Sequence, residues 1–334
     1  MAGSPYSRLP PRAFWRSAVA EADPAAISDL WRLAAPPARD DRLFSLGGSV
    51  AAALHRGLAA TGWNAIEAEP LPVRLPEPVL ARYGWGAGSA RTGPVPTLRL
   101  ALEILAEAAG ATGWEACAWP LDGDRAGRFV DGRRPGVEPA GLPSAEAVAA
   151  ARAQHLVDLA RGLAGATLVL IAPSDTRVWL DPDTGAACPA PPPHRHRVEE
   201  TSLPGLRDEI AALRALLAQL APQARLVLAI SPDPAGGAAA KALLRVAMAE
   251  AEEAGTAAYF PAWELLTNPA ARGALLDPAG GAPSQQGAAA LLAAFTGEAG
   301  QTPAAAPGPD AAGDTDDEED DLLCEEALLE AFRQ

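Results

Sequence analysis

The sequence predicts a three-layer αβα sandwich built on a five-stranded, mainly parallel β-sheet. Short apolar runs of the kind buried in a sheet alternate along the chain with longer amphipathic segments of helical spacing. Glycine, serine or aspartate follows several of these runs directly, as expected where the carboxyl ends of parallel strands meet at one edge. With 334 residues, 49% of them hydrophobic, the chain can bury a core of this size.

The chain begins with an arm and then enters the sheet. We expect residues 1–40 to form an arm packed on the domain, because proline pairs at 10–11 and 36–37 interrupt it. The first sheet elements follow as two apolar runs separated by an alanine-rich segment. The predicted elements are a short helix at 25–33, a strand at 42–46, a helix at 50–60 and a strand at 64–68.

The next part mixes irregular segments with two helices. Residues 70–96 are rich in proline and glycine and are predicted to be irregular, whereas Pro96 suits the first turn of a helix over 97–109. Residues 112–142 contain tryptophan and many turn formers, which indicates an ordered excursion rather than a linker. Ser144 is predicted to cap a helix that extends to residue 163.

The last part completes the alternation. The continuous apolar run 167–171 is typical of a strand buried on both faces of a parallel sheet. A hairpin is predicted over 178–188, turning at Asp181-Pro182-Asp183-Thr184-Gly185. A stripe of leucine and isoleucine predicts a helix over 206–220. The remaining predicted elements are a strand at 225–230, a helix at 237–253, a strand at 257–261 and a helix at 285–295.

The chain is therefore expected to hold one domain, 41–296, followed by a tail. Residues 297–321 are rich in Gly, Pro, Ala, Asp and Glu and are predicted to be a disordered acidic linker. Residues 322–334 regain an amphipathic pattern. Such a segment either docks on its own domain or serves as a tethered motif for a partner.

Charge and composition exclude several classes of function. The formal net charge is −15, and ten acidic residues lie between Asp314 and Glu330. An acidic body without a basic stripe argues against binding nucleic acid, and no apolar run suggests membrane insertion. The three cysteines have no metal-ligand spacing, so we expect a cytoplasmic protein with no metal and no cofactor.

A candidate nucleophile follows the first predicted strand. Gly47 and Gly48 allow a tight turn, and Ser49 then stands where a helix begins, close to unpaired N–H groups that stabilise negative charge. Strand, turn, serine and helix is how α/β hydrolases present a serine. The residues Ser174, Asp175, Ser231 and Asp233 follow later strands and should open onto the same edge.

Many short motifs extend over most of the predicted domain. They include residues 6–15, Gly48-Ser49, Ser89-Ala90-Arg91 with Gly93, Val130-Asp131 with Arg134-Pro135, His155, Trp179, Ser231-Pro232, Lys241 with Leu244-Arg245, and Tyr259-Phe260-Pro261 with Glu264. In order and spacing these motifs resemble the GSCFA family. The resemblance implies a flavodoxin-like or SGNH-like fold, the fold of esterases and acyl transferases, with Ser49 in the nucleophile position.

The chain departs from the pattern of this family at the site. Gly48-Ser49-Val50-Ala51-Ala52 stands where the family has Gly-Ser-Cys-Phe-Ala, so the Cys and Phe are missing. Pro94 replaces an asparagine that could stabilise an oxyanion and lacks even a backbone N–H. The loop after Ser231-Pro232 and the segment 283–286 lack the histidines expected there.

Serine attack needs a base, and the chain offers only four histidines. His55 and His155 are placed within predicted helices and are interpreted as structural. His194 and His196 lie in a connection on the same side as Ser49, so each is a candidate for the base, although a solvated basic loop explains them as well.

Two hypotheses follow. In the first, the site is degenerate and the chain is a pseudoenzyme that binds a small-molecule ligand or a protein partner. In the second, the chain is a serine ester hydrolase or acyl transferase for a small acylated substrate, for example an acylated carbohydrate. Ser49 would then attack while the N–H groups of Ser49 and Gly93 hold the oxyanion.

Overall fold

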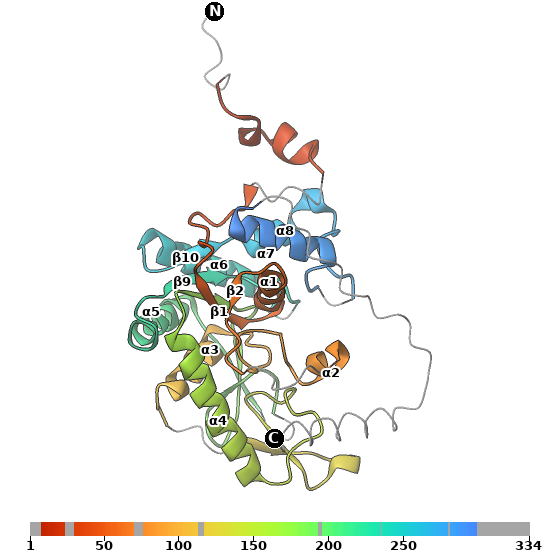
Figure 1. Cartoon of the computed structure of the whole chain (residues 1–334), viewed down its shortest axis with the longest axis vertical. Coiled ribbons are helices and arrows are strands. Elements are labelled where there is room, and N and C mark those ends of the chain that lie inside the picture. Colours follow the sequence, from red (N-terminus) through yellow and green to blue (C-terminus); the bar gives the residue numbers. More distant parts are fainter. Residues whose placement is uncertain are drawn as a thin grey trace, which may run out of the picture.

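The computed structural model describes residues 8–23, 30–69, 76–112, 117–192, 196–234, 236–279 and 281–298. A five-stranded sheet lies at the centre, in the order β10-β9-β5-β1-β2, and every neighbouring pair is parallel (Figure 1). Its strands are β1 (Arg42–Gly47), β2 (Asn64–Ala65), β5 (Leu168–Ala172), β9 (Arg225–Ala229) and β10 (Ala258–Phe260). This arrangement confirms the predicted fold class.

Helices cover both faces of the sheet because its strands are apolar on both sides. Along β5, Val169 and Ile171 face one core, whereas Leu168 and Leu170 face the other. The first core is completed by α3 (Leu98–Ala108), α4 (Ala145–Ala164), α5 (Leu203–Leu220) and α6 (Gly237–Glu253). The second is completed by α1 (Ser49–Ala60), α7 (Ala262–Thr267) and α8 (Gln285–Thr296).

Side-chain caps set the start of several helices. Ser144 accepts a hydrogen bond from the Ala147 N–H at 3.2 Å, so the predicted cap of α4 is confirmed. Thr97 caps α3 in the same way, one residue before the helix begins. Serines at 202 and 284 do so for α5 and α8.

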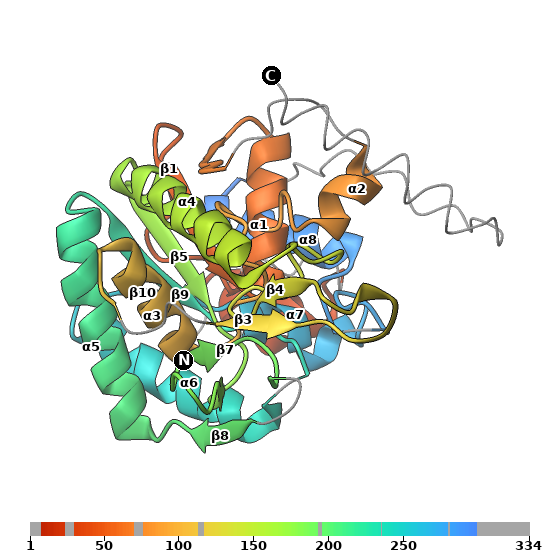
Figure 2. The same cartoon turned by 90° about the horizontal axis from the view of Figure 1, so that it is seen from below.

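Two small antiparallel sheets lie outside the central one. The predicted ordered excursion contains β3 (Ala118–Pro120), η4 (Gly123–Arg125) and β4 (Phe129–Asp131), and Figure 2 shows the two strands side by side. The predicted hairpin is formed by β6 (Arg177–Leu180) and β7 (Ala187–Cys188).

The second of these sheets has a third strand, β8 (Arg197–Glu200), which pairs with β6 at the outer edge of the molecule (Figure 2). The sequence predicts a loop there. All four residues of β8 are exposed, so the strand has no alternation of buried apolar and exposed polar residues from which it could be predicted.

Other predictions need correction. The second strand ends at Ala65 rather than at residue 68, and the segment predicted to be irregular contains α2 (Glu77–Arg82). Neither α7 nor the short turn η5 (Pro269–Ala271) is predicted, because each is too short to show a periodic pattern. Most of the helix predicted at 25–33 lies outside the described residues, and residues 31–33 are not helical.

The N-terminal arm contains the short turns η1 (Pro11–Ala13) and η2 (Arg16–Ala20), which Figure 1 shows beyond the α8 side of the domain. Its later part contacts the domain, since Leu33 is buried and its N–H donates to the Ala294 carbonyl at 3.2 Å. The predicted linker and terminal segment lie outside the described residues, apart from Gly297 and Glu298. Within the described ranges, no helix has both the length and the apolar character to span a bilayer.

Candidate functional site

The carboxyl ends of three neighbouring strands bring the predicted site loops together. The Gly48 N–H, after β1, donates to the Ala172 carbonyl of β5 at 2.9 Å. The Ser231 N–H, after β9, donates to the Pro173 carbonyl at 2.8 Å. The order of the strands makes this convergence unavoidable, because β5 pairs with both β1 and β9.

Ser49 is the first residue of α1, and the two glycines before it fit tightly. A Cβ on Gly47 would lie 2.5 Å from the Ala172 carbonyl oxygen, at a φ of +149° that favours glycine. A Cβ on Gly48 would lie 2.2 Å from Asp233 Oδ2. The glycines therefore let the turn pass close to the loops that follow β5 and β9.

Side chains from the loop after β9 occupy the N-terminus of α1. The Ser49 N–H donates to Asp233 Oδ2 at 3.3 Å, and the Val50 N–H donates to Ser231 Oγ at 3.3 Å. The Ser231 hydroxyl in turn donates to the Ala172 carbonyl at 3.0 Å. The positive end of a helix favours such an anionic neighbour, so Asp233 stabilises the start of α1.

The Ser49 hydroxyl lacks the partner that an activated nucleophile needs. Its oxygen is buried and makes no hydrogen bond with any of the described residues. Of the two base candidates, His194 lies outside the described residues. His196 is exposed and packs edge-on against Trp179, with the ring centroids 5.0 Å apart. The described structure thus brings no imidazole to the serine.

Lys241, on α6, ties two of the site loops together. Its ammonium group donates to the Ser174 carbonyl and, at 2.9 Å, to the Asp233 carbonyl. Burial lowers the pKa of Lys241 to about 8, although the charges of Asp233 and Asp175 act in the opposite direction. The sequence interpretation gave this lysine no role at the site, because its position on α6 does not reveal which loops it reaches.

Ser174 and Asp175 hold the loop after β5 in place. Both N–H groups donate to the Pro96 carbonyl, at 2.8 and 2.9 Å. The Asp175 carboxylate accepts from the Thr176 and Arg177 N–H groups and pairs with the Arg177 guanidinium at 3.1 Å. A carboxylate engaged in this way stabilises the turn rather than orienting a base.

Gly93 adopts a left-handed conformation with a φ of +66°. A Cβ on Gly93 would lie 3.9 Å from Val137 Cγ2 and 4.0 Å from Arg134 Cβ. The loop reaches the site through Val95, whose N–H donates to the Gly47 carbonyl at 3.0 Å. The described hydrogen bonds therefore join this loop to the turn before Ser49 without using the Gly93 N–H.

Two buried histidines pair with glutamates that follow β2. His55 Nε2 lies 2.7 Å from Glu67 Oε1, and its Nδ1 lies 3.4 Å from the Ser45 hydroxyl. Ser45 has no exposed surface and His55 is 1% exposed, whereas the Glu67 side chain is 43% exposed. The hydrogen bonds therefore satisfy the buried side chains of Ser45 and His55, and the Ser45 hydroxyl has no surface that a substrate could reach.

His155 makes the second pair, with Nδ1 2.7 Å from Glu69 Oε1. Burial lowers the pKa of His155 below its ordinary value, although the hydrogen bond to Glu69 opposes this effect. Both histidines are thus buried and hydrogen-bonded, and their structural role stays a prediction.

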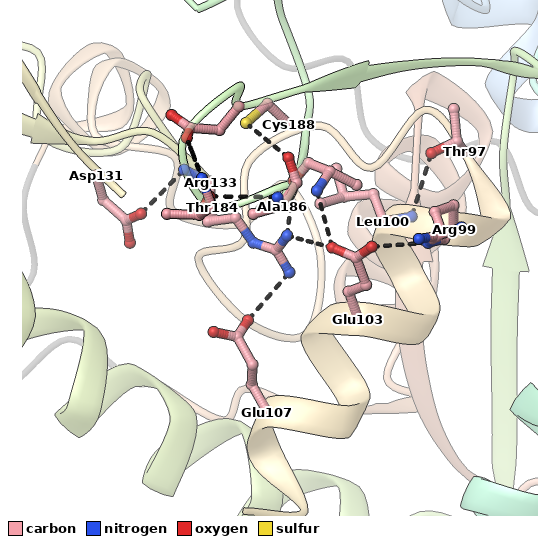
Figure 3. Close-up of polar contacts among 12 residues, drawn as sticks. Thr97, Arg99, Leu100, Glu103, Glu107, Asp131, Arg133, Thr184, Ala186 and Cys188 are labelled. Carbon is pink, nitrogen blue, oxygen red and sulfur yellow. Dashed lines mark hydrogen bonds and ion pairs between the residues drawn. The ribbon is translucent and has the colours of Figure 1, made fainter. Parts of the chain in front are cut away.

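A buried ion network beside the site loops was missed from the sequence. Arg133 is 1% exposed and pairs with Glu103 at 2.5 Å and with Glu107 at 3.1 Å (Figure 3). Arg152 and Arg134 bind Asp131, each at 3.0 Å. Burial alone would raise the pKa of Asp131, but the charges of these two arginines hold it below its usual range.

The network joins α3, α4 and the turn after β4 around paired charges. The sequence signal for this network is the pair of glutamates four residues apart on α3, a helix that is apolar apart from these two residues and Arg99. None of the described residues forms a cluster of side chains able to hold a metal ion. A groove of about 370 Å³ lies between α5 and α6, lined by Ile210, Ala247 and Ala251, and none of the predicted site residues lines it.

The model of the GSCFA family matches residues 109–295, which is more than half of the chain. The chain belongs to the GSCFA family. No curated protein matches it, and no solved structure does so.

The matched part of this GSCFA family member contains β5, β9 and β10 with the loops that carry Ser174, Asp175, Ser231 and Asp233. Ser49 lies before it, in the part where the sequence departs from the motif after which the family is named.

Proposed function

We propose that this GSCFA family member keeps an SGNH-hydrolase-like scaffold, has lost catalytic turnover, and acts by binding a ligand or a partner. The observation that carries the proposal is the Ser49 hydroxyl, which is buried and has no hydrogen-bond partner among the described residues. A serine hydroxyl is a poor nucleophile unless a neighbouring base takes its proton. Without that base, the residue in the nucleophile position cannot attack an ester.

The position of Asp233 supports the same proposal. In a hydrolase the N–H groups at the start of the helix would stabilise a developing oxyanion. Here the Ser49 N–H faces the carboxylate of Asp233 and the Val50 N–H faces the hydroxyl of Ser231. A negatively charged intermediate at this point would meet the charge of Asp233 at close range, which would destabilise it.

The proposed binding role uses the loops at the carboxyl edge of the sheet. Lys241 and Pro96 fix these loops through hydrogen bonds to backbone groups, so the edge is held in place without a bound molecule. Fixed loops at this edge are the usual place for ligands in an open α/β sheet. The occupant is a small molecule or a protein partner, and we place this role in the cytoplasm.

The alternative is an active serine ester hydrolase or acyl transferase. Its supporting observation is the place of Ser49, on the first turn of α1 at the end of a parallel strand. For this function Asp233 would have to leave the Ser49 N–H, and a histidine such as His196 would have to leave Trp179 and reach the hydroxyl.

Labelling with a fluorophosphonate, which reacts with activated serines, decides between the two. The full-length protein and its Ser49→Ala variant would be treated in parallel, with an active serine esterase as the positive control. We expect the same absence of adduct in both proteins, because nothing in the described structure activates the hydroxyl. An adduct found by mass spectrometry on the peptide with Ser49, and missing from Ser49→Ala, would establish the hydrolase instead.

A further inference from the structure

The N-terminal arm exposes a group of large apolar side chains. Leu9, Phe14 and Trp15 are 46%, 40% and 65% exposed, and we refer to these three residues as the arm patch. Val19 of the same arm is buried, and the Ser17 hydroxyl donates to the Pro11 carbonyl at 2.6 Å. The arm is thus internally ordered, and its apolar side chains are exposed within seven residues of one another. Large apolar side chains that are exposed this close together in sequence offer a surface that a partner segment can cover.

Positive charge surrounds the arm patch. Arg8, Arg12 and Arg16 recur every four residues, and no acidic residue lies among them before Glu21. The Arg16 side chain already pairs with Glu21 at 2.5 Å, which shows that carboxylates can bind here. The segment that fits this surface therefore combines apolar side chains with several negative charges.

The tail of the same chain has this composition. Ten acidic residues lie between Asp314 and Glu330, in a chain whose other residues are far less acidic. Five large apolar residues accompany them, namely Leu322, Leu323, Leu328, Leu329 and Phe332. This segment lies outside the described residues, so the match rests on its sequence and on where the chain leaves the domain.

The arm and the tail leave the domain at the same corner. The Leu33 N–H donates to the Ala294 carbonyl at the end of α8. The Arg39 guanidinium binds the Glu298 carboxylate through two contacts, at 3.0 and 2.5 Å. The last described residue of the chain is therefore fixed to the segment from which the arm extends.

The distance along the chain is short enough for contact within one molecule. From Glu298 to Asp314 the chain advances 16 residues, which as a coil would span on the order of 22 Å. A tether of this length holds its end at an effective concentration of about 1 mM near the corner. Binding within the chain then competes well with binding between chains.

We propose that residues 314–332 bind the N-terminal arm of the same molecule. The leucines and Phe332 cover the arm patch, and the aspartates and glutamates face Arg8, Arg12 and Arg16. This inference does not depend on whether Ser49 is active.

Trypsin cleavage after Arg12 and Arg16 tests the proposal, since both bonds lie within the arm. Full-length protein would be compared with a protein truncated after Glu298. We expect cleavage in the arm to be about tenfold faster after truncation, because cleavage follows the population of the uncovered arm. A synthetic peptide of residues 314–334, added to the truncated protein, should slow cleavage again.

Two controls give the test its specificity. Cleavage after Arg207, on the surface of α5, monitors unfolding of the domain and should be equal in both proteins. Replacing Leu328, Leu329 and Phe332 by Ala in the full-length protein keeps all charges of the tail but removes its apolar side chains. This variant should be cleaved in the arm as fast as the truncated protein.

Two results would overturn the proposal. One is equal cleavage in the arm with and without the tail. The other is protection of full-length protein that disappears on about hundredfold dilution, together with a dimer in analytical ultracentrifugation, because the occupant would then be a second copy of the chain.

Discussion

Gly48 and Asp233 fit each other at the start of α1. The φ of Gly48 is −91°, outside the left-handed region, so glycine is needed here for space rather than for backbone conformation. The space is limited by Asp233 Oδ2, which would lie 2.2 Å from an added Cβ, and by Ser231 Cβ, which would lie at 3.1 Å. The two residues are therefore coupled through a contact that neither residue type would suggest alone.

Replacing Gly48 by Ala should destabilise the protein by about 1–3 kcal/mol, because the new methyl group displaces the Asp233 carboxylate. In an Asp233→Ala background the same substitution should cost less, by about 1 kcal/mol, since the clash is gone. Urea unfolding of the four proteins measures this coupling. Additive free energies of unfolding would show that Asp233 does not limit the space at Gly48.

Glu209, on α5, is a second residue whose environment sets its chemistry. It is 8% exposed, and its Oε2 has no hydrogen-bond partner among the described residues. Burial raises the pKa of Glu209 to about 7, although Arg99 and Thr201 act in the opposite direction. The neighbouring acids Glu103 and Asp208 add to the increase.

This shift predicts how the stability of the protein depends on pH. The carboxyl group loses its proton near the ordinary glutamate pKa of 4.5 when unfolded but only near 7 when folded, so stability falls as pH rises through this interval. Glu209→Gln removes the titration. Between pH 4 and pH 8, we expect the free energy of unfolding of the variant to increase by on the order of 2 kcal/mol relative to that of the wild type. If the free energies of unfolding of the wild type and of Glu209→Gln changed with pH in parallel, the raised pKa of Glu209 would be contradicted.

Among the elements, α3 is joined to its neighbours by charge as well as by apolar packing. One face carries buried leucines, while Glu103 and Glu107 bind Arg133 in the turn after β4. Such a pair stabilises little compared with apolar residues of the same size. If one partner of such a pair is removed, however, the other partner remains as a buried charge.

Removing Arg133 should therefore destabilise the protein strongly. Arg133→Met leaves two buried carboxylates without this partner, which costs about 3–5 kcal/mol. The matched control is Arg207→Met, which breaks an exposed pair with Glu250 on the surface of α5 and should cost less than about 1 kcal/mol. Chemical denaturation measures both, and Arg133→Lys serves if the methionine variant does not fold. Equal losses for Arg133→Met and Arg207→Met would refute a stabilising network.

At the scale of the whole molecule, the sequence predicts what depends on local periodicity. The order of strands and helices is correct because β5 and β9 are apolar throughout their inner positions and because α4 and α5 are long. Elements that depend on tertiary contacts were missed. The strand β8 exists through its pairing with β6, and α2 and α7 have only six residues each.

The candidate site likewise has a part that can be predicted from the sequence and a part that cannot. The fold alone brings the loops after β1, β5 and β9 together, so the neighbourhood of Ser49, Ser231 and Asp233 follows from the order of the strands. The contacts of individual side chains cannot be derived from the order of the strands. The partner of His155 is 86 residues away in sequence. No motif near Lys241 indicates that its side chain reaches two loops.

The packing of α1 against α8 has a consequence for synthesis on the ribosome. Leu54 and Leu58 of α1 share a core with Leu291 and Phe295, and Gly57 leaves room for Leu292, whose Cδ2 would lie 3.5 Å from an added Cβ. Among the α-helices of the described residues, the first along the chain is thus covered by the last. Until α8 has been translated, the apolar face of α1 that packs against it stays uncovered, so chaperones that recognise apolar surface can bind there during most of synthesis.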